Sequence, residues 1–336
     1  MKQKLLDFIV CSACHNKLRL DVQVKEEQNS EIIEGELYCT CGRVYPIHSG
    51  IPIFVKSEIH NSKNPGNSQY DKIDERTIER FGFEWTKFSD YSAENFGILV
   101  ASLPVSLFKD KLVLDAGCGA GRHMKLALGL EMEVIGIDFS ESVKSAYLST
   151  KNLLKAHVIQ GNIYNLPFSP NTFDIIYSFG VLHHLPNPML GFEKLVHLLK
   201  PNGIIIICVY QKAFKKVLIG ILRLITTHIP SKILSRLALF CAKLEWILLI
   251  SPYRKLSYSK SLIVRNIVNA VIPLRIKDYA KYDFLTCHTD WFDRLSAPIS
   301  FSFSASEIKE WFKRTGLNEI EVSTIDNSWV RGCGRK

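Results

Sequence analysis

The sequence predicts an α/β protein built on a doubly wound, mostly parallel sheet with helices on both faces. One observation behind this prediction is a series of short apolar runs alternating with helical stretches, which is typical of parallel strands covered on both faces. Another is a turn with three glycines that follows the first run and opens a helix. The expected strands are residues 111–115, 133–138, 157–160, 173–178, 203–210 and 319–324, and the expected helices are residues 121–130, 141–150, 188–199 and 307–315.

Individual elements follow from local signals. Residues 203–210 form a long apolar run, as expected of a buried strand. Ser304 and Glu307 have the spacing of a capping box at the start of the last helix. Residues 70–110 are mixed and aromatic, and we expect two helices around residues 81–85.

Composition excludes several classes of protein. The chain has 336 residues, of which 47% are hydrophobic and 22% charged, so it is neither collagen-like nor wholly disordered. The N-terminus lacks the pattern of a signal peptide, and no apolar run reaches the roughly 18 residues of a spanning helix. We therefore expect a cytoplasmic protein, and peripheral contact with a membrane remains open.

The chain divides into segments of different character. Residues 1–56 read as a small β-rich cysteine module, residues 57–69 as a polar linker, and residues 70–336 as the main domain. Within the main domain, residues 212–280 read as a helical, apolar and basic insertion. This insertion is too long for an ordinary connection.

The glycine turn is the strongest functional signal. Gly117, Gly119 and Gly121 follow a strand that contains Asp115, and Asp138 closes the next strand. Glycines let the backbone approach a ligand closely, and the N-terminus of a helix favours an anionic group. A carboxylate at the end of the second strand can accept hydrogen bonds from ribose hydroxyls.

The spacing is G-x-G-x-G, which differs from the G-x-G-x-x-G of nicotinamide enzymes. Together with the blocks at residues 161–168, 173–185 and 199–203, it makes residues 70–325 resemble the Rossmann-like class I S-adenosylmethionine-dependent methyltransferases. Asn162 stands where that family most often has Asp. The resemblance implies S-adenosylmethionine as cofactor and, as cofactor-binding residues, Asp115, Gly117, Cys118, Gly119, Gly121, Asp138, Asn162, Ile163 and Ser178.

Two histidines are the catalytic candidates. Positioning of the acceptor can supply most of the rate of methyl transfer, and a base is needed only if the acceptor atom loses a proton. His183 and His184 follow the fourth strand, at the sheet edge where the reacting methyl would lie. The alternative is that they order the loop or stack on the cofactor. The aromatic segment 81–85 resembles one that precedes the cofactor domain in some bacterial members; it either folds over the active site or forms an ordinary packed helix.

Four cysteines form two close pairs near the N-terminus, and four thiolates suit a closed tetrahedral zinc site. The module resembles the zinc-ribbon-like domain that accompanies some methyltransferases, as a separate activator or fused. The second pair is tighter than usual, so cysteines that merely pack are the alternative, and His15 and His48 are fallback ligands. The expected zinc ligands are Cys11, Cys14, Cys39 and Cys41.

Positive charge is concentrated in one segment. The whole chain has a formal net charge of +9, whereas residues 211–277 contain thirteen Lys and Arg against the single acid Glu245. A basic amphipathic segment suits an anionic membrane surface or a phosphate-bearing substrate. Solvated faces of lid helices explain the charges equally well.

The expected function is therefore S-adenosylmethionine-dependent methylation of a small-molecule, natural-product or glycan/lipid-linked acceptor, with oxygen as the first choice of acceptor atom. An RNA methyltransferase is the alternative, because a zinc ribbon also accompanies methyltransferases in that setting. A non-catalytic scaffold is the second alternative, and the intact Asp115, Asp138 and glycines argue against it. The sequence identifies neither the acceptor nor the oligomeric state.

Overall fold

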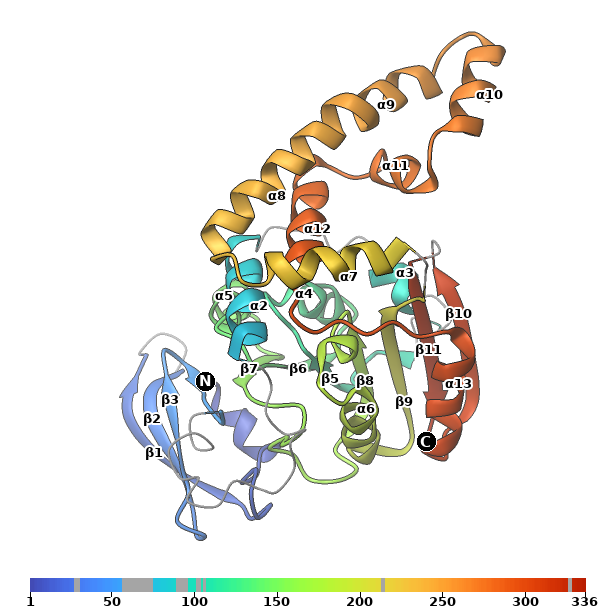
Figure 1. The fold of residues 1–336 in the computed structure, drawn as a ribbon. Coiled ribbons are helices and arrows are strands. Elements are labelled where there is room, and N and C mark those ends of the chain that lie inside the picture. Colours follow the sequence, from blue (N-terminus) through green and yellow to red (C-terminus); the bar gives the residue numbers. More distant parts are fainter. Residues whose placement is uncertain are drawn as a thin grey trace. The chain divides into compact units, whose positions relative to one another are not determined.

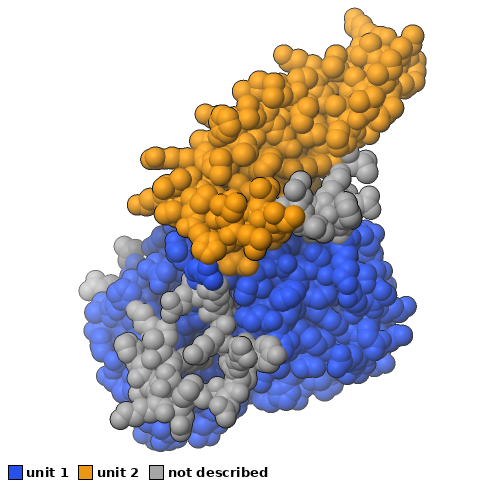
Figure 2. All heavy atoms as spheres, in the orientation of Figure 1, with its two compact units in different colours: residues 1–89, 93–214, 299–336 blue, residues 90–92, 215–298 orange. Residues whose placement is uncertain are grey.

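The computed structural model describes residues 1–26, 31–55, 75–88, 96–100, 104, 107–212, 215–325 and 328–336. The expected linker, residues 57–69, lies outside these ranges. The chain divides into two compact units (Figure 2). The sheet unit comprises residues 1–89, 93–214 and 299–336, and the helical unit comprises residues 90–92 and 215–298. Within the described ranges, no helix is long and apolar enough to cross a membrane.

A seven-stranded sheet forms the centre of the sheet unit (Figure 1). Its order is β10-β11-β9-β8-β5-β6-β7. β5 pairs in parallel with both β6 and β8, so the strand order reverses there, and this reversal is where doubly wound sheets bind ligands. The predicted fold class is confirmed. The strands are β5 (Leu112–Ala116), β6 (Glu133–Asp138), β7 (Ala156–Gln160), β8 (Phe173–Phe179), β9 (Leu199–Tyr210), β10 (Asn318–Ile325) and β11 (Trp329–Arg335).

β11 is a strand that the sequence analysis missed. It lies antiparallel between β9 and β10. It contains Gly332 and Gly334, which weaken strand propensity. Both glycines lie under Phe312, since a Cβ at either position would come within 2.6 Å of that ring. The glycines therefore make room for a helix on the sheet, a reason that local patterning does not reveal.

Helices cover both faces of the sheet because neighbouring strand residues point to opposite sides. Val113 packs in one hydrophobic core and Leu114 in the other, and both are fully buried. The last helix begins with the predicted capping box, in which the Glu307 N–H donates to Ser304 Oγ at 3.3 Å. The helices are α2 (Glu75–Lys87), α3 (Phe96–Val100), α4 (Arg122–Gly129), α5 (Val143–Thr150), the short 3₁₀ turn η3 (Leu182–His184), α6 (Pro188–His197) and α13 (Ala305–Arg314).

The N-terminal module is a four-stranded antiparallel sheet in the order β1-β2-β3-β4. Its core contains Leu37, Tyr45, Ile47 and Phe54, all of them buried. Its elements are the 3₁₀ helix η1 (Gln3–Asp7), β1 (Leu18–Lys25), β2 (Ile32–Cys39), β3 (Val44–His48) and β4 (Ile51–Pro52).

Most of the insertion expected at residues 212–280 lies in the helical unit. This unit extends to residue 298 because α12 packs against α7 and α8. One of its buried clusters joins Ala242, Ile250, Ile276 and Cys287. The unit consists of α7 (Lys215–Thr226), α8 (Ser231–Glu245), the π-helical turn η4 (Trp246–Ile250), α9 (Ser251–Ser257), α10 (Leu262–Val271), α11 (Leu274–Tyr279) and α12 (Phe284–Ser296).

Candidate functional site

A cavity lies at the carboxyl ends of β5 and β6, where the strand order reverses. It encloses about 860 Å³, part of which is open to solvent. The glycine turn contributes Gly117 and Gly119 to its wall, β6 contributes Asp138, and the loop after β7 contributes Gly161 and Ile163. Residues from three successive strand ends therefore meet in one hollow, as the sequence predicted.

The glycine turn adopts a backbone that other residues rarely adopt. Gly117, Gly119 and Gly121 have φ angles of 87°, 52° and 78°. A Cβ at Gly117 would lie 2.3 Å from a methyl carbon of Val181. Gly121 precedes α4 as its N-cap residue and is not part of the cavity wall. The turn thus needs glycine both for its conformation and for the space that it leaves.

Asp138 joins the turn to the end of β6. Its Oδ2 accepts a hydrogen bond from the Gly119 N–H at 3.0 Å, and its Oδ1 accepts from the N–H and Oγ of Ser140 at 2.9 and 2.7 Å. A carboxylate has about four acceptor positions, so it can accept a further hydrogen bond from a ligand hydroxyl. Asp138 therefore orders the site in addition to lining it.

Asp115 lies behind the cavity wall and is buried. Burial raises the pKa of its carboxyl group to about 8, and the negative charge of Asp138 acts in the same direction. The Tyr177 hydroxyl, a hydrogen-bonding neighbour of this carboxyl group, acts in the opposite direction. A cationic ligand nearby would favour the ionised carboxylate, so this buried carboxyl group fits a positively charged cofactor.

The other predicted cofactor residues fall into two groups. Cys118 and Ile163 line the cavity, and burial raises the pKa of the Cys118 thiol well above its usual value, which keeps the thiol protonated. Asn162 and Ser178 do not line it. The Asn162 Oδ1 accepts the Tyr164 N–H at 2.9 Å, and the Ser178 hydroxyl donates to the Ala116 carbonyl at 2.9 Å. These two side chains hold the loop after β7 and the end of β5.

The two candidate histidines occupy different environments. His184 lines the cavity, with Nδ1 at 2.7 Å from the Ile299 carbonyl oxygen and its ring centroid 4.6 Å from that of Phe81. A carbonyl can only accept, so Nδ1 carries a proton, and whenever the ring is neutral its lone pair is on Nε2. His183 is fully buried beside Tyr210, with ring centroids 4.0 Å apart, and is absent from the cavity wall.

Helix α2 supplies a wall that the sequence analysis only partly anticipated. Phe81 and Trp85, from the aromatic segment, line the cavity, and so do Thr77 and Ile78. Trp85 lies against the turn, since a Cβ at Gly119 would be 3.2 Å from its ring. The sequence analysis also missed Arg122, whose guanidinium carbon lies 4.8 Å from the Trp85 ring centroid. Its position as the first residue of α4, directly after the glycine turn, was the available signal.

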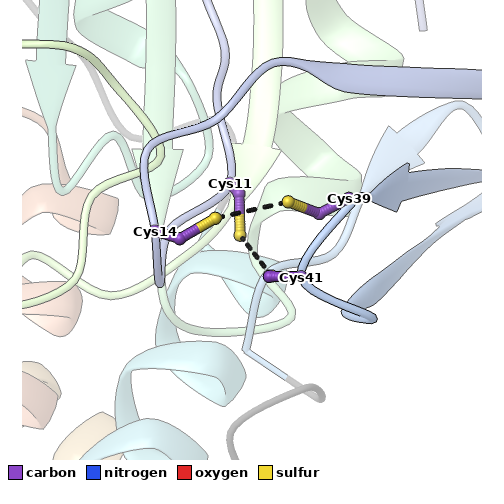
Figure 3. Close-up of side chains that lie close together, drawn as sticks. All are labelled: Cys11, Cys14, Cys39 and Cys41. Atoms are coloured by element: carbon purple, nitrogen blue, oxygen red, sulfur yellow. Dashed lines mark hydrogen bonds between the residues drawn. The ribbon is translucent and has the colours of Figure 1, made fainter.

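The four cysteines converge at one end of the N-terminal module (Figure 3). Their sulfur atoms all lie within 4.8 Å of one another; Cys11 and Cys41 are 3.7 Å apart, and Cys14 and Cys39 are 3.3 Å apart. A tetrahedral zinc site with Zn–S bonds of about 2.3 Å separates its sulfurs by roughly 3.8 Å. The donor set therefore fits zinc in spite of the tight second pair. His48 instead contacts Glu34 at 3.0 Å, and among the described residues the cluster contains no histidine.

The module also contacts the loop that follows β7. The Phe54 N–H donates to the Gln160 carbonyl at 2.8 Å where the loop begins, and the Val10 N–H donates to the Pro167 carbonyl at 2.9 Å where it ends. Gln160 Nε2 in turn donates to the carbonyl of Phe139, which lines the cavity. The module thus holds both ends of a loop that contributes Gly161 and Ile163 to the site.

The fold and the cavity define a class of doubly wound domains that bind a ligand at the reversal of strand order. Residues 114–207 match the family model described as a methyltransferase domain, and residues 2–50 match the model described as Trm112p-like protein. The chain therefore combines a methyltransferase domain with an N-terminal Trm112p-like domain. The methyltransferase domain implies S-adenosylmethionine, and the cysteine cluster could bind zinc.

Curated relatives match only part of the chain. A tRNA U34 carboxymethyltransferase from Pseudoalteromonas atlantica is 32% identical over 128 residues, which are 37% of this chain and 37% of the relative. A demethylmenaquinone methyltransferase from Staphylococcus carnosus is 35% identical over 100 residues, which are 28% of this chain and 41% of the relative. The chain thus spans well under half the length of these relatives.

A solved complex between the Haloferax volcanii Trm112 methyltransferase activator and a methyltransferase is similar at 15% identity with a TM-score of 0.47. The match covers 79% of this chain and 97% of that one.

Proposed function

We propose that this protein is an S-adenosylmethionine-dependent methyltransferase. The observation that carries the proposal is the meeting of the glycine turn, Asp138 and the loop after β7 around one cavity, inside the segment that matches the methyltransferase domain. S-Adenosylmethionine, when bound, supplies a methyl group activated by its sulfonium charge.

Each part of the cavity then has a role in binding. Asp138 accepts hydrogen bonds from the ribose hydroxyls, and Ile163 packs beside the adenine. Gly117 and Gly119 admit the methionine portion close to the backbone. Asp115 retains its proton in the unliganded chain near neutral pH, and a cationic ligand would favour its ionised form, whose charge in turn stabilises that ligand.

His184 is the candidate general base. It lines the cavity, and the hydrogen bond of Nδ1 to the Ile299 carbonyl leaves Nε2 as the basic nitrogen. General bases contribute roughly 10²- to 10⁴-fold to rate when the acceptor must lose a proton. His183 orients this ring by packing against it, with ring centroids 4.1 Å apart.

We infer RNA as the acceptor class. The support is that several relatives are named tRNA U34 carboxymethyltransferase, which favours the RNA alternative over the small-molecule O-methylation that the sequence analysis preferred. A lipid-soluble quinone is the second candidate, because other relatives are named demethylmenaquinone methyltransferase.

Transfer of a labelled methyl group tests the acceptor. Purified protein is incubated with labelled S-adenosylmethionine and either total bacterial tRNA or demethylmenaquinone in detergent. We expect label in tRNA, and binding to tRNA that weakens steeply with added salt. Label only in the quinone would refute the RNA assignment and retain the methyltransferase. No binding of S-adenosylhomocysteine by calorimetry would refute the methyltransferase itself.

His184→Gln tests the base with the acceptor identified in that assay. We expect the single-turnover rate to fall at least a hundredfold with unchanged cofactor affinity. His197→Gln, an exposed histidine on α6, is the matched control. An unchanged rate in H184Q would remove the base assignment.

A further inference from the structure

Helix α10 is an apolar helix that its own fold leaves uncovered. Seven of its ten residues are Leu, Ile, Val or Ala. The structure describes all ten, and none is buried. Ile263 and Val271, which lie on the same face as Ile267, are 71% and 74% exposed. An apolar surface of this kind normally marks a place of interaction.

Helix α8 carries a second exposed apolar surface. One of its faces, with Leu234, Ala238 and Ala242, is buried within the helical unit. Beside that face runs a second apolar stripe, exposed and spaced alternately by four and three residues, so that it follows one side of the helix into η4. The stripe consists of Ile233, Leu237, Phe240, Leu244 and Ile247.

Basic side chains border the stripe. Lys232, Arg236 and Lys243 are exposed, and each directly precedes a residue of the stripe. Within the described part of the chain, none of the three side chains makes an ion pair or a hydrogen bond. Residues 215–271 contain ten Lys and Arg against the single acid Glu245, so this segment alone carries a net charge of +9.

The combination of exposed apolar and basic side chains favours one kind of partner over two others. Proteins bind RNA bases mainly through aromatic and guanidinium stacking, whereas Phe240 is the single aromatic side chain among the Leu, Ile and Val residues named for this surface. A symmetric contact with a second copy would bring two borders of the same positive sign together. An anionic bilayer satisfies both features, because its acyl region takes the apolar side chains and its headgroups pair with the cations.

We propose that helices α8 and α10 bind to the surface of an anionic phospholipid bilayer. The lipid-facing surface consists of Ile233, Leu237, Phe240, Leu244, Ile247, Ile263, Ile267 and Val271. Figure 1 shows α8 and α9 in line with each other, and α10 packs against α9 at the end of this rod. The helices lie on the membrane, since no described helix is suited to cross it. The proposal does not depend on which acceptor is methylated.

Vesicle flotation of the full chain, without cofactor, tests the proposal. We expect binding to equimolar phosphatidylcholine and phosphatidylglycerol vesicles, at least tenfold weaker binding to phosphatidylcholine alone, and release by added salt. Equal binding to both vesicle types, or to neither, would overturn the proposal.

Two triple variants separate the apolar and electrostatic contributions. The variant I263Q/I267Q/V271Q removes the exposed face of α10, and we expect binding to fall at least tenfold. The variant K232Q/R236Q/K243Q should lose roughly fivefold per charge on anionic vesicles. The matched charge control is K125Q/K309Q/K313Q, three exposed lysines of the sheet unit, and the apolar control is Leu154→Gln, a residue that is 84% exposed. Both controls should bind as the natural chain does.

Sedimentation velocity without lipid tests the rival occupant. We expect no self-association that depends on the lipid-facing surface. A concentration-dependent dimer that I263Q/I267Q/V271Q abolishes, together with absent vesicle binding, would assign this face to a second copy and overturn the proposal. Thermal melts of all variants should match the natural chain, because every substituted side chain is exposed or partly exposed.

Discussion

The sheet unit and the helical unit use their apolar residues in different ways. In the sheet unit, strand residues such as Leu114, Ile135 and Ile176 are fully buried between two layers of helices. In the helical unit, buried apolar residues such as Leu234, Ala238 and Phe292 lie in α8 and α12, whereas α9 and α10 contain no buried residue. Burial on two faces holds backbone segments rigidly enough to form a binding site, whereas exposed apolar helices keep surface available for a partner.

The two units also differ in how they shift the pKa of a carboxyl group. Asp115, in the sheet unit, is buried and its pKa is raised to about 8 chiefly by loss of hydration. Asp290, in the helical unit, is partly buried; burial alone would raise its pKa, but the guanidinium groups of Arg294 and Arg275 lower it. The Asp115 carboxyl group would therefore respond to the charge of a bound ligand, whereas the charge of Asp290 is already balanced by two arginines of the same unit.

The largest expected effect is that of zinc removal, which should destabilise the N-terminal module of the sheet unit and leave the helical unit folded. Structural zinc contributes on the order of 10 kcal/mol of folding free energy in small domains. Chelation or Cys11→Ser should abolish cooperative melting of the module and weaken S-adenosylhomocysteine binding at least tenfold, because the module holds both ends of the loop at residues 160–167. The helical signal of residues 215–298 should remain in circular dichroism.

Cys241→Ser is the control for zinc removal, because Cys241 lies in α8 and outside the cysteine cluster. It should leave metal content and melting unchanged. Purified natural protein without zinc would contradict the prediction.

Two glycine substitutions should change the stability of the fold in opposite directions. Gly117→Ala forces a positive φ of 87° on alanine and places its methyl group 2.3 Å from Val181. It should cost about 2–5 kcal/mol of stability and remove cofactor binding. Gly220→Ala, within α7, meets nothing within 4 Å and should stabilise its helix by about 0.5–1 kcal/mol. Calorimetric melting and titration with S-adenosylhomocysteine measure both, and equal effects would show that the turn is not constrained.

Asp138→Ala should lower both affinity and stability. Loss of the ribose contacts should weaken S-adenosylhomocysteine binding roughly tenfold or more. The sequence alone predicts an unchanged fold stability, but the carboxylate holds Gly119 and Ser140 in the unliganded chain. We therefore expect a further loss of about 1–3 kcal/mol in unfolding free energy.

Asp283→Ala in the helical unit is the matched control for Asp138. Its carboxylate only caps α12, where Oδ1 accepts the Thr286 N–H at 2.8 Å. It should cost about 1 kcal/mol of stability and leave affinity unchanged. Unchanged affinity in D138A would remove Asp138 from the cofactor site.

The two carboxyl groups predict opposite pH dependences, each of at most about 1.4 kcal/mol per pH unit. Between an unfolded pKa near 3.8 and a folded pKa of about 8, folded Asp115 retains a proton that the unfolded chain has lost. The stability of the sheet unit should therefore fall as pH rises through this window, and Asp115→Asn should remove this contribution. The contribution of Asp290 should instead be lost as pH falls below its unfolded pKa. Melts at several pH values measure both slopes.

Sequence alone determined the features that depend on local patterning. The apolar runs, the glycine turn, Asp138 at the end of its strand and the paired cysteines were all predictable, because strand periodicity, backbone permissiveness and ligand spacing are properties of a few adjacent residues.

Tertiary structure decided which side chains reach the cavity. Asn162, Ser178 and His183 were predicted as site residues, yet each is turned toward its own loop or core. His184 gains its orientation from the Ile299 carbonyl, far along the chain. The module holds the loop at residues 160–167 through backbone hydrogen bonds that carry no sequence signature. Such contacts join residues that are distant in sequence, so only the folded chain brings their partners together.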